Sequence, residues 1–215
     1  MMKLVARCGA AMALALTLAA PAMGASATSR SDKTAKNMLK MQDALKKGES
    51  QLDSIIASLN GLSSAQGKDL VDRYTDFSKQ VEKLDSTAKE VESKAKKAKS
   101  QREDYLEAWK KDQNKIQNEQ LKTASEARRT ELEPLLQQIS DGLTSGKENF
   151  VPLLQNLKDL SLFLGNDLSE HGLTTAQPLI SECNKSAALV KEDVDKANEG
   201  LASLAARISP GGTAK

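Results

Sequence analysis

The sequence predicts an all-α protein, an elongated antiparallel four-helix bundle from which a long coiled-coil hairpin projects. The 215 residues include only 3% aromatic residues, 12 Gly and 5 Pro, too few for the turns and β-forming residues of a sandwich or barrel. Apolar residues recur at alternating steps of three and four along most of the chain, which is typical of helices with an apolar seam. No Gly or Pro occurs between Lys68 and Gln120, so one long uninterrupted helix is expected there.

Residues 1–24 have the features of a secretory signal peptide. Lys3 and Arg7 give a positive start, and a short apolar stretch of Ala, Leu and Met follows. Small residues then allow cleavage after Gly24 or Ala27. Because the stretch is too short to cross a bilayer comfortably, a periplasmic or secreted protein is expected, with an uncleaved membrane anchor as the alternative.

Four apolar seams predict a helical bundle over residues 25–209, followed by a flexible tail at 210–215. The helices are expected at about 31–62, 68–118, 121–168 and 174–208. A turn is expected at 170–172, and either Thr174 or Thr175 is expected to cap the last helix.

Short loops make neighbouring helices antiparallel, so the second and third helices should form one long hairpin. Its tip, about Tyr105–Glu131, should project beyond the two shorter helices. Pro134 and Pro152 lie inside the third seam, and each should remove a backbone hydrogen bond and bend the axis. A bowed, continuous third helix is expected, and a break at Thr144–Gly146 is the alternative.

The charge balance gives no support for nucleic-acid binding. The full chain has 31 Lys and Arg against 29 Asp and Glu, and Lys3 and Arg7 of the leader account for the excess. The basic run over 94–102 could face an anionic surface such as lipid head groups. Flanking acids suggest instead an ordinary solvated helix face, so a membrane-surface partner is only weakly indicated.

No residue constellation indicates an enzyme, a metal site or a cofactor, and no small-molecule substrate is evident. His171 is the only histidine and has no cluster of partners with ligand spacing. Loss of Cys8 with the leader would leave Cys183 alone, either buried or free to form an intermolecular disulfide. Its seam position favours burial as a small apolar residue.

The hairpin tip is the best candidate for a partner-binding site. Exposed aromatic residues surrounded by charge are typical of protein-interaction patches. The candidate residues are Tyr105, Trp109, Lys110, Lys111 and Ile116. The alternative is that the two aromatic rings fill the seam of the hairpin against Leu121 or Ala124.

From Leu70 to Leu204 the chain resembles a family of exported bacterial helical proteins catalogued as a domain of unknown function (number twenty-nine fifty-nine). The likeness lies in Asp69-Leu-Val-Asp-Arg-Tyr74, in the region from Trp109 to Asn118, and in Val151-Pro152-Leu153-Leu154. The turn around 163–168 matches the family pattern only approximately. The resemblance implies an exported α-helical fold and no particular activity.

Two functions are compatible with these features. The first is a non-enzymatic protein of the bacterial envelope, a structural or protein-interaction module that binds a partner or its own copies through the tip. The second is a periplasmic carrier or chaperone-like binder of lipid or unfolded protein. Small seam residues should allow close packing without a cavity, which favours the first; they are Ala88, Ala95, Gly142 and Gly146.

Overall fold

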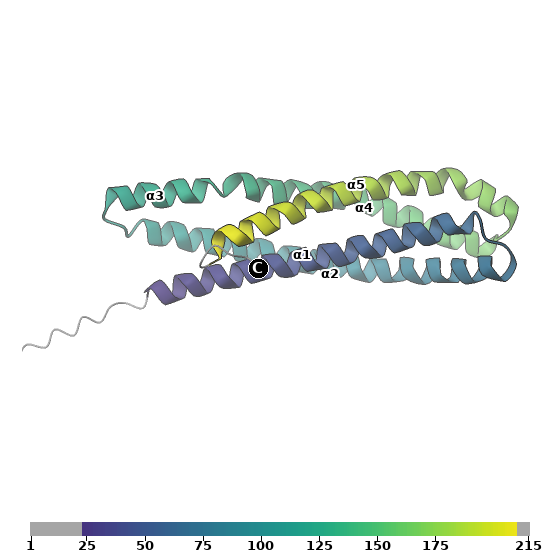
Figure 1. Ribbon diagram of the computed structural model, residues 1–215, viewed down its shortest axis with the longest axis horizontal. Coiled ribbons are helices and arrows are strands. Elements are labelled where there is room, and N and C mark those ends of the chain that lie inside the picture. The colour runs from purple at the N-terminus through teal and green to yellow at the C-terminus, as the bar shows by residue number, and fades with distance from the viewer. Residues whose placement is uncertain (1–22, 210–215) are drawn as a thin grey trace, which may run out of the picture.

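The computed structural model describes residues 23–209, which form five α-helices in an elongated bundle (Figure 1). The helices are α1 (Met23–Leu62), α2 (Gly67–Gln113), α3 (Glu119–Thr130), α4 (Glu133–Asn166) and α5 (Glu170–Ile208). This part of the chain contains no strand, which confirms the all-α prediction. The leader and the flexible tail were predicted mainly on residues 1–22 and 210–215, which lie outside the described range.

The helices pack as two antiparallel hairpins side by side. α1 pairs with α2, α4 pairs with α5, and α1 also packs along α5 (Figure 1). α2 and α4 touch over much less of their length than the other three neighbouring pairs do. The bundle therefore has three closed sides and one more open side, between α2 and α4.

The third predicted helix is divided in two. The α-helical hydrogen-bond pattern is interrupted at Glu131 and Leu132, although both keep right-handed helical backbone angles, and α4 begins directly after them with Pro134 in its first turn. A proline is well tolerated there because its missing N–H would have no acceptor within the helix. The prediction of one continuous bowed helix was therefore wrong. The alternative break at Thr144–Gly146 is also absent, since α4 continues through those residues and through Pro152.

α5 begins four residues earlier than the seam predicted. Ser169 is its N-cap, and the backbone N–H of Gly172 donates to the Ser169 hydroxyl at 3.1 Å. The turn predicted at 170–172 is therefore the first turn of the helix, and neither Thr174 nor Thr175 is the cap. The seam could not show this start because the first residues of α5 are mostly polar.

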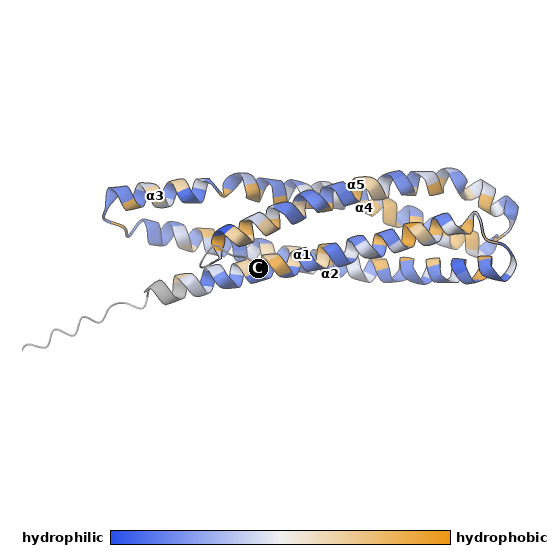
Figure 2. Cartoon of the chain, viewed as in Figure 1, coloured by the Kyte–Doolittle hydropathy of each residue, from blue (hydrophilic) through white to orange (hydrophobic). Residues whose placement is uncertain are grey.

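Two clusters of buried side chains hold the bundle together. The loop-end core lies toward the α1–α2 and α4–α5 loops, and its fully buried members include Leu59, Phe77, Leu157 and Ile180. The tip-end core lies toward α3 and includes Met41, Leu132, Ala197 and Leu204. Figure 2 shows hydrophobic and hydrophilic residues alternating along the helices, as expected for seams that face a shared interior.

α1 extends further toward the tip than the sequence predicted. Arg30 of α1 forms an ion pair with Asp112 near the end of α2, with the nitrogen and oxygen 2.6 Å apart. At the C-terminal end of α5, the backbone oxygen of Arg207 accepts a hydrogen bond from Arg128 of α3 at 3.3 Å. The projecting part of the hairpin is therefore shorter than expected. Within residues 23–209, no helix is both long and apolar enough to cross a membrane.

Candidate functional site

The predicted tip residues lie where α2 ends and α3 begins. The indole N–H of Trp109 donates to the hydroxyl of Ser125 in α3 at 2.9 Å, which ties the two helices together. The rings of Tyr105 and Trp109 lie 5.7 Å apart with planes tilted by 60°. Both side chains are half-buried and pack against the tip-end core. The structure thus places the two rings in the helix seam. Their neighbours there are Ser125 and the tip-end core, whereas the alternative prediction named Leu121 or Ala124.

The remaining tip candidates lie at the surface. Lys110 and Lys111 are exposed, and Lys111 forms an ion pair with Glu107 at 2.7 Å. Ile116 is half-buried in the turn that follows α2, and Leu121 at the start of α3 is 63% exposed. The tip therefore offers a small apolar surface made of Ile116 and Leu121 beside exposed lysines, rather than an exposed aromatic patch.

The other residues singled out in the sequence are His171, Cys183 and the basic run of α2. His171 is exposed in the first turn of α5, and within residues 23–209 no group of His, Cys, Asp and Glu could hold a metal ion. Cys183 is fully buried in the loop-end core, as its seam position predicted, and burial raises the pKa of its thiol to about 11. In the basic run, Lys94 and Lys96 pair with acids one turn earlier on α2.

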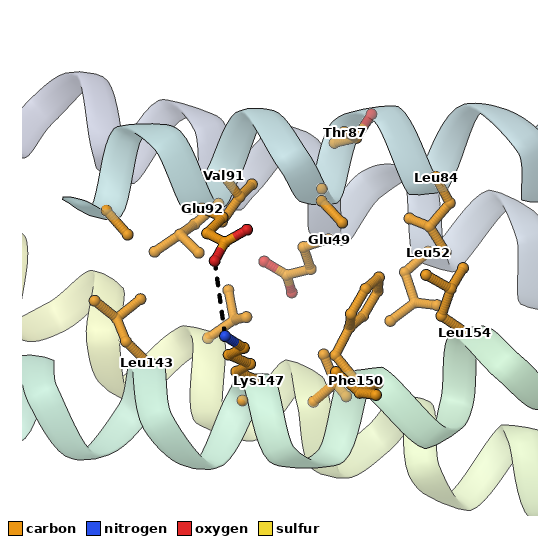
Figure 3. Close-up of a pocket in the computed structure, with 18 of the residues that line it drawn as sticks. Glu49, Leu52, Leu84, Thr87, Val91, Glu92, Leu143, Lys147, Phe150 and Leu154 are labelled. Atoms are coloured by element: carbon orange, nitrogen blue, oxygen red, sulfur yellow. Dashed lines mark ion pairs between the residues drawn. The ribbon is translucent and has the colours of Figure 1, made fainter. Parts of the chain in front are cut away.

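A cleft of about 320 Å³ lies in the middle of the bundle, on the open side between α2 and α4 (Figure 3). We call it the central cleft. All four long helices contribute to it, and its surface is mainly aliphatic. Its apolar lining includes Leu45, Leu52, Ala88, Ala95, Phe150 and Leu154. Its size is at the lower end of the range of small-molecule pockets in proteins.

The small seam residues that were expected to exclude a cavity instead line this one. Ala88 and Ala95 of α2 and Gly142 and Gly146 of α4 all border the central cleft. Gly142 does allow close packing, but with α5: a Cβ at this position would lie 2.7 Å from the backbone oxygen of Asp193. α4 is therefore drawn toward α5, and the short side chains of α2 do not reach across the remaining space.

Two ion pairs connect α2 and α4 along the open side of the bundle. Lys147 and Glu92 lie 3.7 Å apart and face each other across the central cleft (Figure 3), and Lys158 and Asp85 lie 2.8 Å apart further along. Hydrogen bonds from Lys158 and then Lys89 lower the pKa of Asp85 to about 2. Beyond Lys158, the open side continues as a shallower groove with polar residues such as Tyr74 and Ser161.

One acid of the central cleft stands apart from the others. Glu49 of α1 lines the central cleft, and Figure 3 shows its carboxylate in the gap between the α1/α2 hairpin and the α4/α5 hairpin. Burial is the main cause that raises the pKa of Glu49, followed by the nearby charge of Asp195. Sequence reasoning missed this residue because an acid next to a seam position looks like an ordinary surface charge. The only signal was its place beside Gly48 and between Leu45 and Leu52.

The fold and the central cleft define the chain as an all-α helical bundle that is closed on three sides and open on the fourth. Residues 22–204 match the family described as "Protein of unknown function (DUF2959)". The chain belongs to this family, as the resemblance in the sequence indicated. No curated protein and no solved structure matches it.

Proposed function

We propose that this protein is an exported, non-enzymatic carrier that holds a small apolar ligand in the central cleft. A single observation carries the proposal: the four long helices leave a mainly aliphatic space of about 320 Å³ in the bundle. This space lies on the side between α2 and α4, which touch less than the other neighbouring helix pairs do. Apolar space inside a bundle is a common place for ligands. Export is supported by the leader features of residues 1–24.

Ligand entry needs little rearrangement. The α2/α4 side is bridged by ion pairs whose lysine side chains are 70% exposed at Lys147 and 44% exposed at Lys158. Exposed ion pairs stabilise a fold only slightly, so their separation is the least costly way to widen the bundle. Toward the loops, Leu84 of α2 and Leu153 of α4 are both buried in the loop-end core, so the widening is confined to the middle of the bundle around Lys147 and Glu92.

A neutral apolar fluorophore, N-phenyl-1-naphthylamine, tests the proposal directly. Its fluorescence should rise on mixing with the purified chain. The double variant Ala88→Leu/Ala95→Leu should fill the cleft and weaken binding at least tenfold. The matched control, Ala57→Leu/Ala127→Leu, adds the same atoms at exposed positions and should bind normally. Absence of binding to the unchanged chain, or equal binding by the filled variant with intact helicity, would contradict the proposal.

The exported location has its own test. Fractionation of cells that express the full chain should recover the protein outside the cytoplasm, with an N-terminus created after Gly24 or Ala27. Both positions lie in the first turns of α1, so cleavage there shortens α1 and leaves Ala35, Met38 and Met41 of the tip-end core in the mature chain. A full-length product in the cytoplasm would exclude export.

A second candidate function is docking of a protein through the hairpin tip. It is favoured by the 63% exposure of Leu121 next to half-buried Ile116 and exposed Lys110 and Lys111. A photocrosslinker at Lys111 should give one defined adduct in intact cells, and Leu121→Glu should abolish it. A crosslinker at Lys83, exposed on α2 far from the tip, is the control. Equal adducts from both positions would exclude this function.

A further inference from the structure

The charges that border the central cleft are all paired except one. Its lining includes the lysines Lys89, Lys147 and Lys191 and the acids Glu49, Asp85 and Glu92. Each lysine has an acid partner: Lys89 with Asp85 at 2.7 Å, Lys147 with Glu92 at 3.7 Å, and Lys191 with Asp53 at 2.7 Å. Among the described residues, the Glu49 carboxylate has no hydrogen-bond or ion-pair partner.

The surroundings of Glu49 compensate its charge only in part. Asp195 and Asp53 disfavour its ionised form, Lys191 and Lys46 favour it, and burial adds to the two acids. Lys191 is already engaged with Asp53. The half-buried carboxylate therefore keeps acceptor atoms available to a cationic donor at the border of the apolar cleft.

We infer that the central cleft selects an aliphatic chain with a cationic amine at one end, the amine lying beside Glu49 and the chain lying among the leucine, valine and alanine side chains. This inference rests on the proposed function and names the ligand class for the same site. An ammonium group donates charge-assisted hydrogen bonds to a carboxylate, whereas a ligand carboxylate is repelled by it. Because the lining carries three lysines and three acids, the unpaired Glu49 carboxylate and not the net charge decides the selectivity.

The volume sets the size of the ligand. A cleft of about 320 Å³ is at the lower end of the range of small-molecule pockets, which suits a ligand no larger than a single alkyl chain. A helix from a partner protein, about 10 Å across, or an unfolded polypeptide with bulky side chains needs more space than this volume provides. A single alkyl chain is therefore the occupant that we propose.

Three probes of equal chain length test the inference: decylamine, decanol and decanoate, each displacing N-phenyl-1-naphthylamine at pH 8. At this pH an alkylamine is cationic, and pH 8 lies well above the ordinary pKa of a glutamate carboxyl. The unchanged chain should bind decylamine at least tenfold more tightly than decanol, and decanoate most weakly. Glu49→Gln should remove the preference for decylamine and leave decanol binding unchanged. Glu148→Gln, an exposed acid on α4 outside the cleft, is the control and should change neither.

The outcomes separate this inference from the proposed function. Equal affinity for the three probes, or tighter binding of decanoate, would overturn the amine preference while an apolar carrier remained. An unchanged preference in Glu49→Gln would also overturn it. If no probe displaced the fluorophore and the fluorophore itself did not bind, both proposals would fail.

Discussion

The α4/α5 interface and the α2/α4 side are built from similar small residues, yet one is tight and the other is open. Between α4 and α5, a Cβ at Gly142 would lie 2.7 Å from the backbone oxygen of Asp193, and one at Gly200 would lie 2.7 Å from Ile139. Between α2 and α4, Ala88 and Ala95 face a space of about 320 Å³. The same short side chains that bring one pair of backbones together leave a void between the other pair.

The difference shows that a small residue closes an interface only when the opposing backbone can approach it. α4 cannot lie against both neighbours at Gly142, and it lies against α5. The distance to α2 is then spanned by long lysine side chains that pair with Glu92 and Asp85. These bridges hold the helices at a distance that side-chain packing would not produce.

The largest expected difference between the two regions is in stability. Leu157 is fully buried in the loop-end core, while Leu154, one turn earlier on α4, lines the central cleft and is half-buried. Leu157→Ala should lower the free energy of unfolding by about 2–5 kcal/mol, because it leaves a cavity among packed side chains. Leu154→Ala should cost only about 1 kcal/mol, because its side chain already borders a void. Chemical denaturation measures both, and equal losses would show that the cleft is packed in solution.

Thiol reactivity gives the next comparison. Ala88→Cys places a thiol at the central cleft, while Cys183 stays buried in the loop-end core with the pKa of its thiol raised from 9.0 to about 11. At neutral pH such a rise lowers the thiolate fraction about a hundredfold, and burial slows labelling further. Maleimide labelling of the native variant followed by mass spectrometry should modify the new cysteine at least a hundredfold faster. Similar rates would mean that the loop-end core opens as readily as the α2/α4 side.

The sequence predicted the apolar faces of the helices better than their spacing or ends. The seam of α5 correctly placed Ile180, Cys183 and Leu204 inside. It could not show that Ser169 caps the helix four residues before the seam begins, because a cap is a backbone hydrogen bond between polar residues. The break before Pro134 was missed for a related reason: a seam continues across Leu132 whether or not the backbone stays helical.

The central cleft was beyond the reach of the seam pattern altogether. Periodicity tells which side of a helix faces the interior, but not how far away the next helix lies. Gly142 and Gly146 looked equivalent in the sequence, although only Gly142 is pressed against the backbone of α5. Glu49 could be recognised as unusual only once its neighbours on the other helices were known.

Substituting alanine for these two glycines should change the free energy of unfolding in opposite directions. Gly142→Ala should lower the free energy of unfolding by about 1–2 kcal/mol, because steric strain against α5 exceeds the gain in helix propensity. Gly146→Ala should raise it by about 0.5–1 kcal/mol, because its Cβ would lie at an ordinary 3.5 Å from the Cβ of Asp193. Thermal unfolding followed by circular dichroism measures both. A gain in both variants would show that α4 and α5 are less closely packed than described.

The smallest expected effect concerns the bridge between Lys158 and Asp85. Asp85→Asn should lower the unfolding temperature slightly at neutral pH. Because Lys158 and Lys89 lower the pKa of Asp85 from 3.8 to about 2, the folded state favours the ionised carboxylate. This stabilisation is fully present above the ordinary pKa of 3.8 and is lost as the pH falls through about 2. The difference between the variant and the unchanged chain should therefore be constant above about pH 5 and shrink below pH 4.

The control is Asp76→Asn, an exposed acid of α2 outside the central cleft, whose curve should follow that of the unchanged chain. A difference in Asp85→Asn that persisted undiminished to pH 2 would mean that the asparagine disturbs packing rather than an ion pair. The small size of the effect is itself informative, because a bridge that contributes little to folding can break at little cost. Loss of the bridge should then speed release of the apolar fluorophore more than it lowers stability, since it loosens α2 against α4, the neighbouring helices that touch over the least of their length.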